Sequence, residues 1–204
     1  MLRLLALTLL AVLLPLTAPY DLGAAGADAV EEDWELVLAT PDPDVTSPQI
    51  TTSMQLDSSV ELPTMNFILN YRDTPAFAAG GVQVKMTAGG STTAASKGSE
   101  QLQTPDETVT WTQRLSLNGG AVTFEVVSGK STTWGDFGAG TLSVGASTGV
   151  GSLAGYDPAV SVSKSSPTFG ANRVARMTLL RVRYYKDHLL LSTDATPRPI
   201  ELPN

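Results

Sequence analysis

Apolar and polar residues alternate with a period of two along most of the chain after residue 29. Trp34, Leu36 and Leu38 fall on one side of such a segment, with charged residues among those between them. Because successive side chains of a β-strand point to opposite faces, this period predicts strands with one buried face. Further segments of this kind lie at residues 50–56, 65–71, 82–86, 109–117, 122–126, 142–146, 174–185 and 189–191, with a short one at 160–162.

Turn-forming residues separate many of these segments. Asn118-Gly119-Gly120 lies between two alternating segments and predicts a tight hairpin, because these residues tolerate a positive φ. Ser128-Gly129-Lys130 and Lys186-Asp187-His188 are expected to form two more turns. Longer irregular loops are expected at Ala88–Gly98 and at Gly135–Tyr156.

Together these signals predict an all-β domain of about nine to eleven short strands. The uneven loop lengths favour an antiparallel β-sandwich with jelly-roll-like, concanavalin-like connections over an up-and-down barrel. The residues at Ala27–Glu32 are compatible with one turn of helix, and no helical pattern longer than two turns follows the signal peptide. Since proline lacks the amide donor of a ladder, residues 40–48 are expected to form an exposed connection and the proline-rich C-terminal tail to leave the sheet.

The first 29 residues have the pattern of a secretory signal peptide. Arg3 precedes an apolar run from Leu4 to Leu16, which is shorter than the roughly 20 residues needed to span a membrane. Ala27-Asp28-Ala29 fits the small-x-small rule for cleavage, cleavage after Ala27 fits almost as well, and an uncleaved anchor is the alternative. We therefore expect a secreted, periplasmic or cell-envelope protein, with one domain at residues 30–204 and no membrane span after cleavage.

The composition narrows the classes of function. Of the 204 residues, 42% are hydrophobic and 16% are charged, which favours a globular domain over a disordered chain. The absence of cysteine excludes disulfides, a thiol nucleophile and thiolate metal centres, so packing must stabilise the exported domain. The formal net charge of −7 argues against a nucleic-acid partner, because phosphate contacts need basic residues.

Acidic residues gather near the N-terminus and arginines near the C-terminus. Glu31, Asp33 and Glu35 are spaced two apart, so on a strand their carboxylates share one face. This spacing resembles the acidic strand of laminarinase-like retaining glycosidases, whose paired carboxyl groups act as nucleophile and acid/base. The alternative is a solvated acidic face, with Glu35 opposite Arg181 or Arg183 if the first and last long strands are neighbours. The arginines also suit an anionic polysaccharide.

Aromatic residues flank the glycine-rich segment that begins at Gly135. We expect a ligand site formed by Trp134, Asp136, Phe137 and Tyr156, in which aromatic faces meet a sugar ring and the carboxylate accepts hydrogen bonds. The alternative is that Trp134 and Phe137 close one end of the sandwich.

The sequence gives little indication of a metal site or of a catalytic histidine. Asp42 and Asp44 are candidate calcium ligands, but two acids fall short of the roughly six to eight oxygens that calcium takes. Metal binding therefore stays open, and no cofactor is expected. His188, the single histidine, is expected at a hairpin position beside Asp187.

Three segments carry a resemblance to other proteins. Thr133–Gly138, Tyr156-Asp157-Pro158 and Phe169–Tyr185 resemble uncharacterised secreted β-sandwich proteins of planctomycete-type bacteria. This resemblance implies export and a sandwich fold but no activity and no site residue. The overall texture is also similar to concanavalin-like and jelly-roll carbohydrate modules, a likeness that concerns the fold alone.

From these observations we expect an exported, non-catalytic β-sandwich protein that binds carbohydrate or another cell-surface polymer. The first alternative is a structural or adhesive protein of the cell envelope, whose partners are other envelope proteins. The second is a polysaccharide hydrolase or lyase that depends on Asp33 or Glu35.

Overall fold

The computed structural model describes residues 26–39, 48–57, 63–71, 81–97 and 107–202. They form thirteen strands, one α-helix and one 3₁₀ turn. The elements are β1 (Ala29–Leu38), β2 (Gln49–Gln55), β3 (Thr64–Leu69), β4 (Val82–Ala88), β5 (Ser91–Lys97), β6 (Thr108–Asn118), β7 (Ala121–Ser131), β8 (Gly135–Gly138), β9 (Ser143–Ser147), α1 (Pro158–Lys164), β10 (Ser166–Thr168), η1 (Ala171–Arg173), β11 (Val174–Lys186), β12 (Leu189–Asp194) and β13 (Arg198–Pro199).

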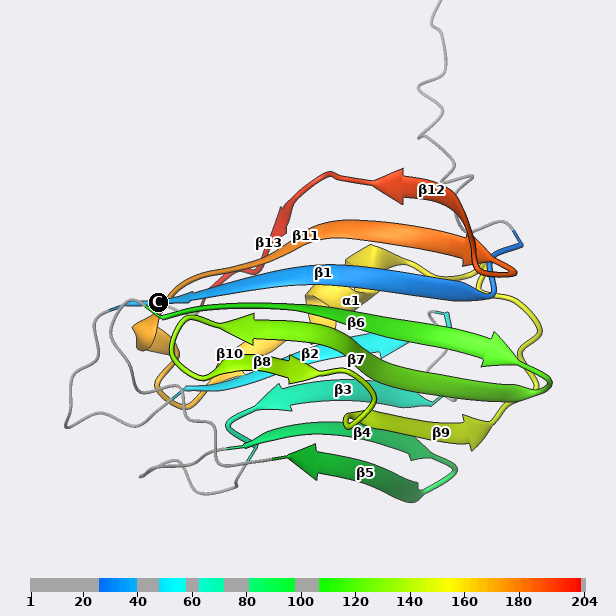
Figure 1. Cartoon of the computed structure of the whole chain (residues 1–204), viewed down its shortest axis with the longest axis horizontal. Helices are drawn as coiled ribbons and strands as arrows, with labels where there is room; N and C mark the ends of the chain where they lie inside the picture. Colours follow the sequence, from blue (N-terminus) through cyan, green and yellow to red (C-terminus); the bar gives the residue numbers. More distant parts are fainter. Residues whose placement is uncertain (1–25, 40–47, 58–62, 72–80, 98–106, 203–204) are drawn as a thin grey trace, which may run out of the picture.

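The strands form two antiparallel sheets (Figure 1). The larger sheet has eight strands in the order β12-β11-β1-β6-β7-β8, with β13 beside β11 and β9 beside β7. The smaller sheet has five strands in the order β10-β2-β3-β4-β5. This arrangement confirms the expected all-β fold and is consistent with a β-sandwich.

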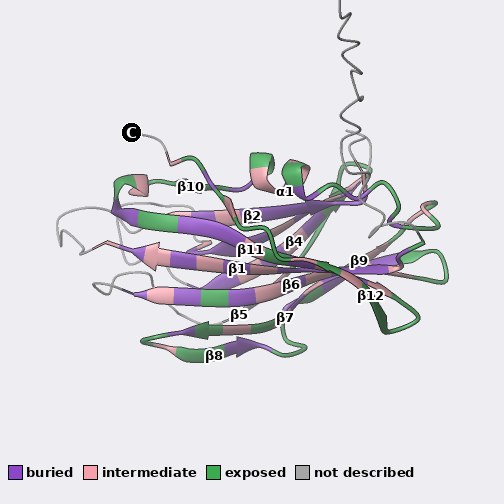
Figure 2. Ribbon diagram, turned by 90° about the horizontal axis from the view of Figure 1, so that it is seen from above, coloured by how far each residue is buried: buried purple, intermediate pink, exposed green. Residues whose placement is uncertain are grey.

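The core lies between the two sheets because most strands turn their apolar positions inward. Trp34 on β1 and Trp111 on β6 stack with ring centroids 6.2 Å apart, and both are almost fully buried. Phe67 on β3 of the smaller sheet contacts Trp111 at 5.6 Å, so aromatic rings join the two layers. Buried and less buried residues alternate along β1 and β6, as Figure 2 shows. This alternation confirms the period of two seen in the sequence.

The strand count exceeds the expected nine to eleven because short and polar strands escaped the pattern. The loop expected at Ala88–Gly98 is largely β5, which pairs with β4 over its whole length. This strand is an edge of the smaller sheet, and its residues from Ser91 to Ala94 are exposed. With neither face buried there, the strand needs no apolar alternation.

Two local expectations near the middle of the chain are wrong. Ser128-Gly129-Lys130 does not turn but continues β7, which pairs with β6 on one side and β8 on the other. Gly129 is required there because a Cβ atom at this inward position would overlap the ring of Phe137. The short strand expected at residues 160–162 is instead part of α1, which starts at the N-cap Asp157 with Pro158 in its first turn.

The ends of the chain also differ from expectation. Residues Ala27–Glu32 form no helical turn, since β1 begins at Ala29 between two partner strands. The C-terminal tail returns to the sheet, where Arg198 and Pro199 pair with β11 as β13. The expected hairpins at Gly119-Gly120 and Asp187-His188 are confirmed. The prolines of residues 40–47 and most of the predicted signal peptide lie outside the described residues.

The residues just before β1 belong to the folded part of the chain. Ala27 is fully buried, and its carbonyl oxygen accepts a hydrogen bond from the Leu153 amide at 2.9 Å. The Asp28 carboxylate accepts a hydrogen bond from the Asp187 amide at 2.9 Å and lies 3.4 Å from Lys186 Nζ. Cleavage after Ala29 would therefore remove contacts that the fold uses.

Candidate functional site

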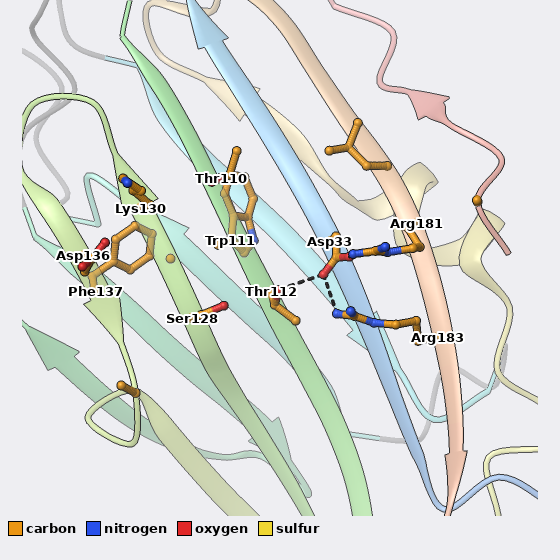
Figure 3. A pocket seen from close by; sticks show the side chains of 14 residues that line it. Asp33, Thr110, Trp111, Thr112, Ser128, Lys130, Asp136, Phe137, Arg181 and Arg183 are labelled. Carbon is orange, nitrogen blue, oxygen red and sulfur yellow. Dashed lines mark hydrogen bonds and ion pairs between the residues drawn. The ribbon is translucent and has the colours of Figure 1, made fainter. Parts of the chain in front are cut away.

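A hollow lies on the outer face of the eight-stranded sheet (Figure 3). Its volume is about 710 Å³. The hollow spans β8, β7, β6, β1 and β11, so distant parts of the sequence meet in it. We call it the outer trough; its polar lining residues are Asp33, Thr110, Thr112, Ser128, Lys130, Asp136, Arg181 and Arg183.

The shape of the outer trough follows from side-chain length. Thr110 and Thr112 occupy outward positions of β6, and Ser128 lies opposite Thr112 on β7. These short hydroxyl side chains form the floor between two groups of longer charged side chains, as Figure 3 shows. Lys130 and Asp136 stand on one side, from β7 and β8, and lie opposite each other in the strand register.

On the other side, arginines of β11 reach over to Asp33 of β1. Arg181 and Arg183 approach the Asp33 carboxylate at 2.6 Å and 2.7 Å, and the Thr112 hydroxyl donates to it at 2.8 Å. With 14% exposure, the Asp33 side chain is largely enclosed by these partners. The carboxylate therefore holds two guanidinium groups at the border of the trough.

The other two acids of β1 have arginine partners as well. Glu31 lies 3.0 Å from Arg183 and 3.3 Å from Arg114, and Glu35 lies 2.7 Å from Arg176. The three carboxylates thus share one face, and β1 and β11 are neighbours, as expected. The expected partners of Glu35 are wrong, because the register places Arg183 opposite Glu31 and Arg181 opposite Asp33. After the bulge between Asp33 and Trp34, Glu35 lies opposite Thr178.

The four residues expected to bind a ligand are divided between surface and core. Asp136 and Phe137 line the outer trough, but only Asp136 is exposed. The ring of Phe137 points into the core, stacked on Phe67 at 6.1 Å and on Trp134 at 5.1 Å. This packing is the arrangement expected if Trp134 and Phe137 close part of the sandwich.

Tyr156 lies elsewhere, in a buried polar network around Glu32. The hydroxyl of Tyr156 donates to Glu32 Oε1 and lies 2.9 Å from Ser161 Oγ. Trp34 Nε1 and Gln113 Nε2 donate to Glu32 Oε2 at 2.9 Å and 2.8 Å. All these contacts are inside the sandwich, so Tyr156 serves the core.

Burial changes the ionisation of both groups. Removal from water raises the pKa of Glu32 above its ordinary value of 4.5, although the hydrogen bonds from Tyr156, Trp34 and Gln113 oppose this shift. Burial and the adjacent Glu32 carboxyl raise the pKa of Tyr156 well above its ordinary range. The network also joins the sheets, because Thr52 of β2 donates to Gln113 Oε1 at 2.7 Å.

Sequence reasoning missed Glu32 as an inward-facing residue, although a signal was present. Glu32 has the same parity as Trp34, Leu36 and Leu38, so it had to face the core with them. Glu107 is a second buried acid, and no pattern in the sequence predicted its burial. Its Oε1 accepts hydrogen bonds from Ser131, Thr133 (2.8 Å) and Trp134 Nε1.

The remaining candidate residues do not join a site. His188 is exposed in the β11–β12 turn and lines a smaller hollow with Asp28, Arg114 and Glu125. Asp42 and Asp44 lie outside the described residues. Within the described ranges, no group of three or more histidine and acidic residues is placed to hold a metal ion. No helix in the described part of the chain is long and apolar enough to cross a membrane.

No protein-family model matches the chain, and no curated protein matches it.

Proposed function

We propose that the protein is an exported, non-catalytic β-sandwich protein that binds carbohydrate or another cell-surface polymer in the outer trough. The observation that carries this proposal is the hydroxyl-lined floor between two charged borders on an exposed sheet face. Hydroxyl, carboxylate and guanidinium groups suit the dense hydroxyls and acidic groups of polysaccharides. The jelly-roll-like connections expected from the sequence are part of the same proposal.

The trough offers hydrogen-bonding groups in a fixed arrangement. The side chains of Thr110, Ser128 and Lys130 make no hydrogen bond or ion pair with another described residue. They project from paired strands, which hold their positions before a ligand arrives. Such preorganisation lowers the entropy cost of binding.

Export requires cleavage that leaves the fold intact. Because Ala27 and Asp28 make contacts within the domain, we place the cleavage before Gly26. Gly23-Ala24-Ala25 also fits the small-x-small rule. N-terminal sequencing of the exported protein tests this site, and a mature N-terminus at Asp28 or Val30 would contradict it.

A glycan array and retention on polysaccharide columns test the binding proposal, with two matched variants. Lys130→Glu reverses a charge in the trough, whereas Lys85→Glu makes the same change on β4 of the other sheet. We expect the protein to bind at least one polysaccharide. Lys130→Glu should weaken this binding about tenfold or more, which is the size of loss seen for a charge-assisted contact. Lys85→Glu should leave the binding unchanged. Equal effects of both variants, or binding to no glycan, would contradict the proposal.

The arrangement of Glu31, Asp33 and Glu35 offers the hydrolase or lyase alternative no support. Each carboxylate is occupied by one or two arginines, whereas a general acid or nucleophile must be available to the substrate. A structural or adhesive envelope protein is the better second candidate, because one edge of the larger sheet exposes consecutive leucines.

A further inference from the structure

The edge strand β12 exposes an unusual apolar surface. Leu189, Leu190 and Leu191 are 71%, 55% and 47% exposed, and apart from Phe169 they are the exposed large apolar side chains of the described residues. Three consecutive exposed apolar residues are rare in a folded domain unless a partner covers them. On one side β12 pairs with β11, and no other described strand lies on its far side.

The other strands at sheet edges carry features that prevent pairing with another chain. Along its exposed part β5 is polar or alanine, and the exposed residues of β9 are only serine and glycine. The strand β8 has only four residues and begins and ends with glycine, and β10 and β13 are very short and contain a proline. Short length, proline and polar residues are the usual protection of an edge. The six residues of β12 include no proline, lysine or arginine. This edge alone, among those described, is both long enough and apolar enough to pair.

We propose that β12 pairs antiparallel with β12 of a second copy of this chain, so that the two larger sheets become one. The register of such a pair can be symmetric. With Leu191 opposite Leu191 of the second copy, Leu190 lies opposite Ser192 and Leu189 lies opposite Thr193. All three leucines then lie within the paired strands, and the outward backbone groups of β12 gain partners.

Two other occupants are tested as alternatives. The apolar run Leu4–Leu16 joins the domain near this edge, because Asp28 binds Lys186 and Asp187, just before Leu189. A lipid surface would also accept leucines. A second copy is favoured over a lipid surface because lipid leaves the unpaired backbone groups of β12 without partners, whereas a strand satisfies them. It is favoured over the apolar run because the proposed cleavage before Gly26 removes that run.

The test is sedimentation of the chain from Gly26 onward, which contains both sheets and the core, at about 5 to 500 μM, a range suited to small, weak interfaces. We expect a reversible dimer. Leu190→Lys should raise the dimer dissociation constant at least tenfold, whereas Ala94→Lys on the exposed edge β5 should leave it unchanged. A monomer at all concentrations would overturn the proposal.

A cysteine variant tests the register and the occupant. Because the chain has no cysteine, Leu191→Cys introduces a single thiol. Directly opposed residues of antiparallel strands have Cα atoms about 4.5–5.5 Å apart, within disulfide reach. We expect rapid oxidation to a covalent dimer for Leu191→Cys and slow oxidation for Ala94→Cys. Equal rates, or a monomer that binds phosphatidylcholine–phosphatidylglycerol vesicles through these leucines, would overturn the proposal. Neither result bears on glycan binding, so the two proposals can fail separately.

Discussion

Replacement of Glu32 gives the sharpest test of how the core is held together. Glu32→Ala removes the acceptor for three buried donors, which are Trp34 Nε1, Gln113 Nε2 and the Tyr156 hydroxyl. A buried donor without a partner costs roughly 1–3 kcal/mol. The substitution also removes the cost of burying the carboxyl group, which offsets part of this sum. We therefore expect the free energy of unfolding to fall by about 3–5 kcal/mol. In a domain of this size that loss lowers Tm by roughly 10 °C.

Glu32→Gln is the matched control because it keeps the shape of the side chain. Its carbonyl oxygen accepts from Trp34 and Gln113, and its amide donates to the Tyr156 hydroxyl, which then donates to Ser161. We expect a stability within about 1 kcal/mol of the natural protein near pH 4.5.

The pH dependence separates the two variants further. Burial raises the pKa of Glu32 above 4.5, so the folded state holds this proton to higher pH than the unfolded chain does. The contribution of this protonation to the stability of the folded state is thus fully present at low pH. It is lost as the pH rises from 4.5 through the folded-state pKa of Glu32. Glu32→Gln lacks this titration, so it should gain stability relative to the natural protein over that interval.

Urea unfolding followed by tryptophan fluorescence from pH 4.5 to 8 measures these differences. The reasoning fails if Ala and Gln at position 32 are equally stable, or if the difference between Gln and Glu does not change with pH. Glu35→Gln, at a partly exposed ion pair on the same strand, should show only a small and nearly constant effect.

Three further predictions concern packing, the ion pairs and the predicted ligand residue. Gly129→Ala should cost about 2–3 kcal/mol by overpacking against Phe137, and Phe137→Leu should recover part of that loss in the double variant, as denaturant midpoints will show. Asp33→Asn should cost about 1–2 kcal/mol, because it weakens the contacts of Arg181 and Arg183, and high salt should shrink the difference. Tyr156→Phe should lower stability by about 1–2 kcal/mol and leave glycan retention unchanged, since its hydroxyl contacts only buried groups; a loss of retention at unchanged stability would restore Tyr156 as a ligand residue.

Much of the fold could be predicted from the sequence where burial imposes a pattern. The alternation at Trp34, Leu36 and Leu38 appears because β1 has one face on the core. The strand β5 left no such pattern because its exposed edge position requires none. The helix α1 was missed because its buried face is made of Pro158 and Ser161, which carry no apolar signal.

The candidate site was less predictable because it depends on register. The opposite charges of β1 and β11 indicate that the two strands are neighbours, but their register, with its bulge after Asp33, decides which arginine each acid meets. A bulge of this kind leaves no mark in the spacing of charges. Likewise, Asp136 faces the surface and Phe137 faces the core because successive residues of β8 point to opposite sides. The sequence predicted a loop at residues 135–156, so this alternation was not expected there.

The central place of β1 has a consequence for the folding rate. The strand β1 is hydrogen-bonded to β6 and β11, and its contacts to them span 79 and 150 residues in sequence. Such non-local pairing closes large loops and makes folding slow. The larger sheet therefore cannot close around β1 until β11 has been synthesised. That delay is compatible with the proposed export, in which the chain crosses a membrane before it folds.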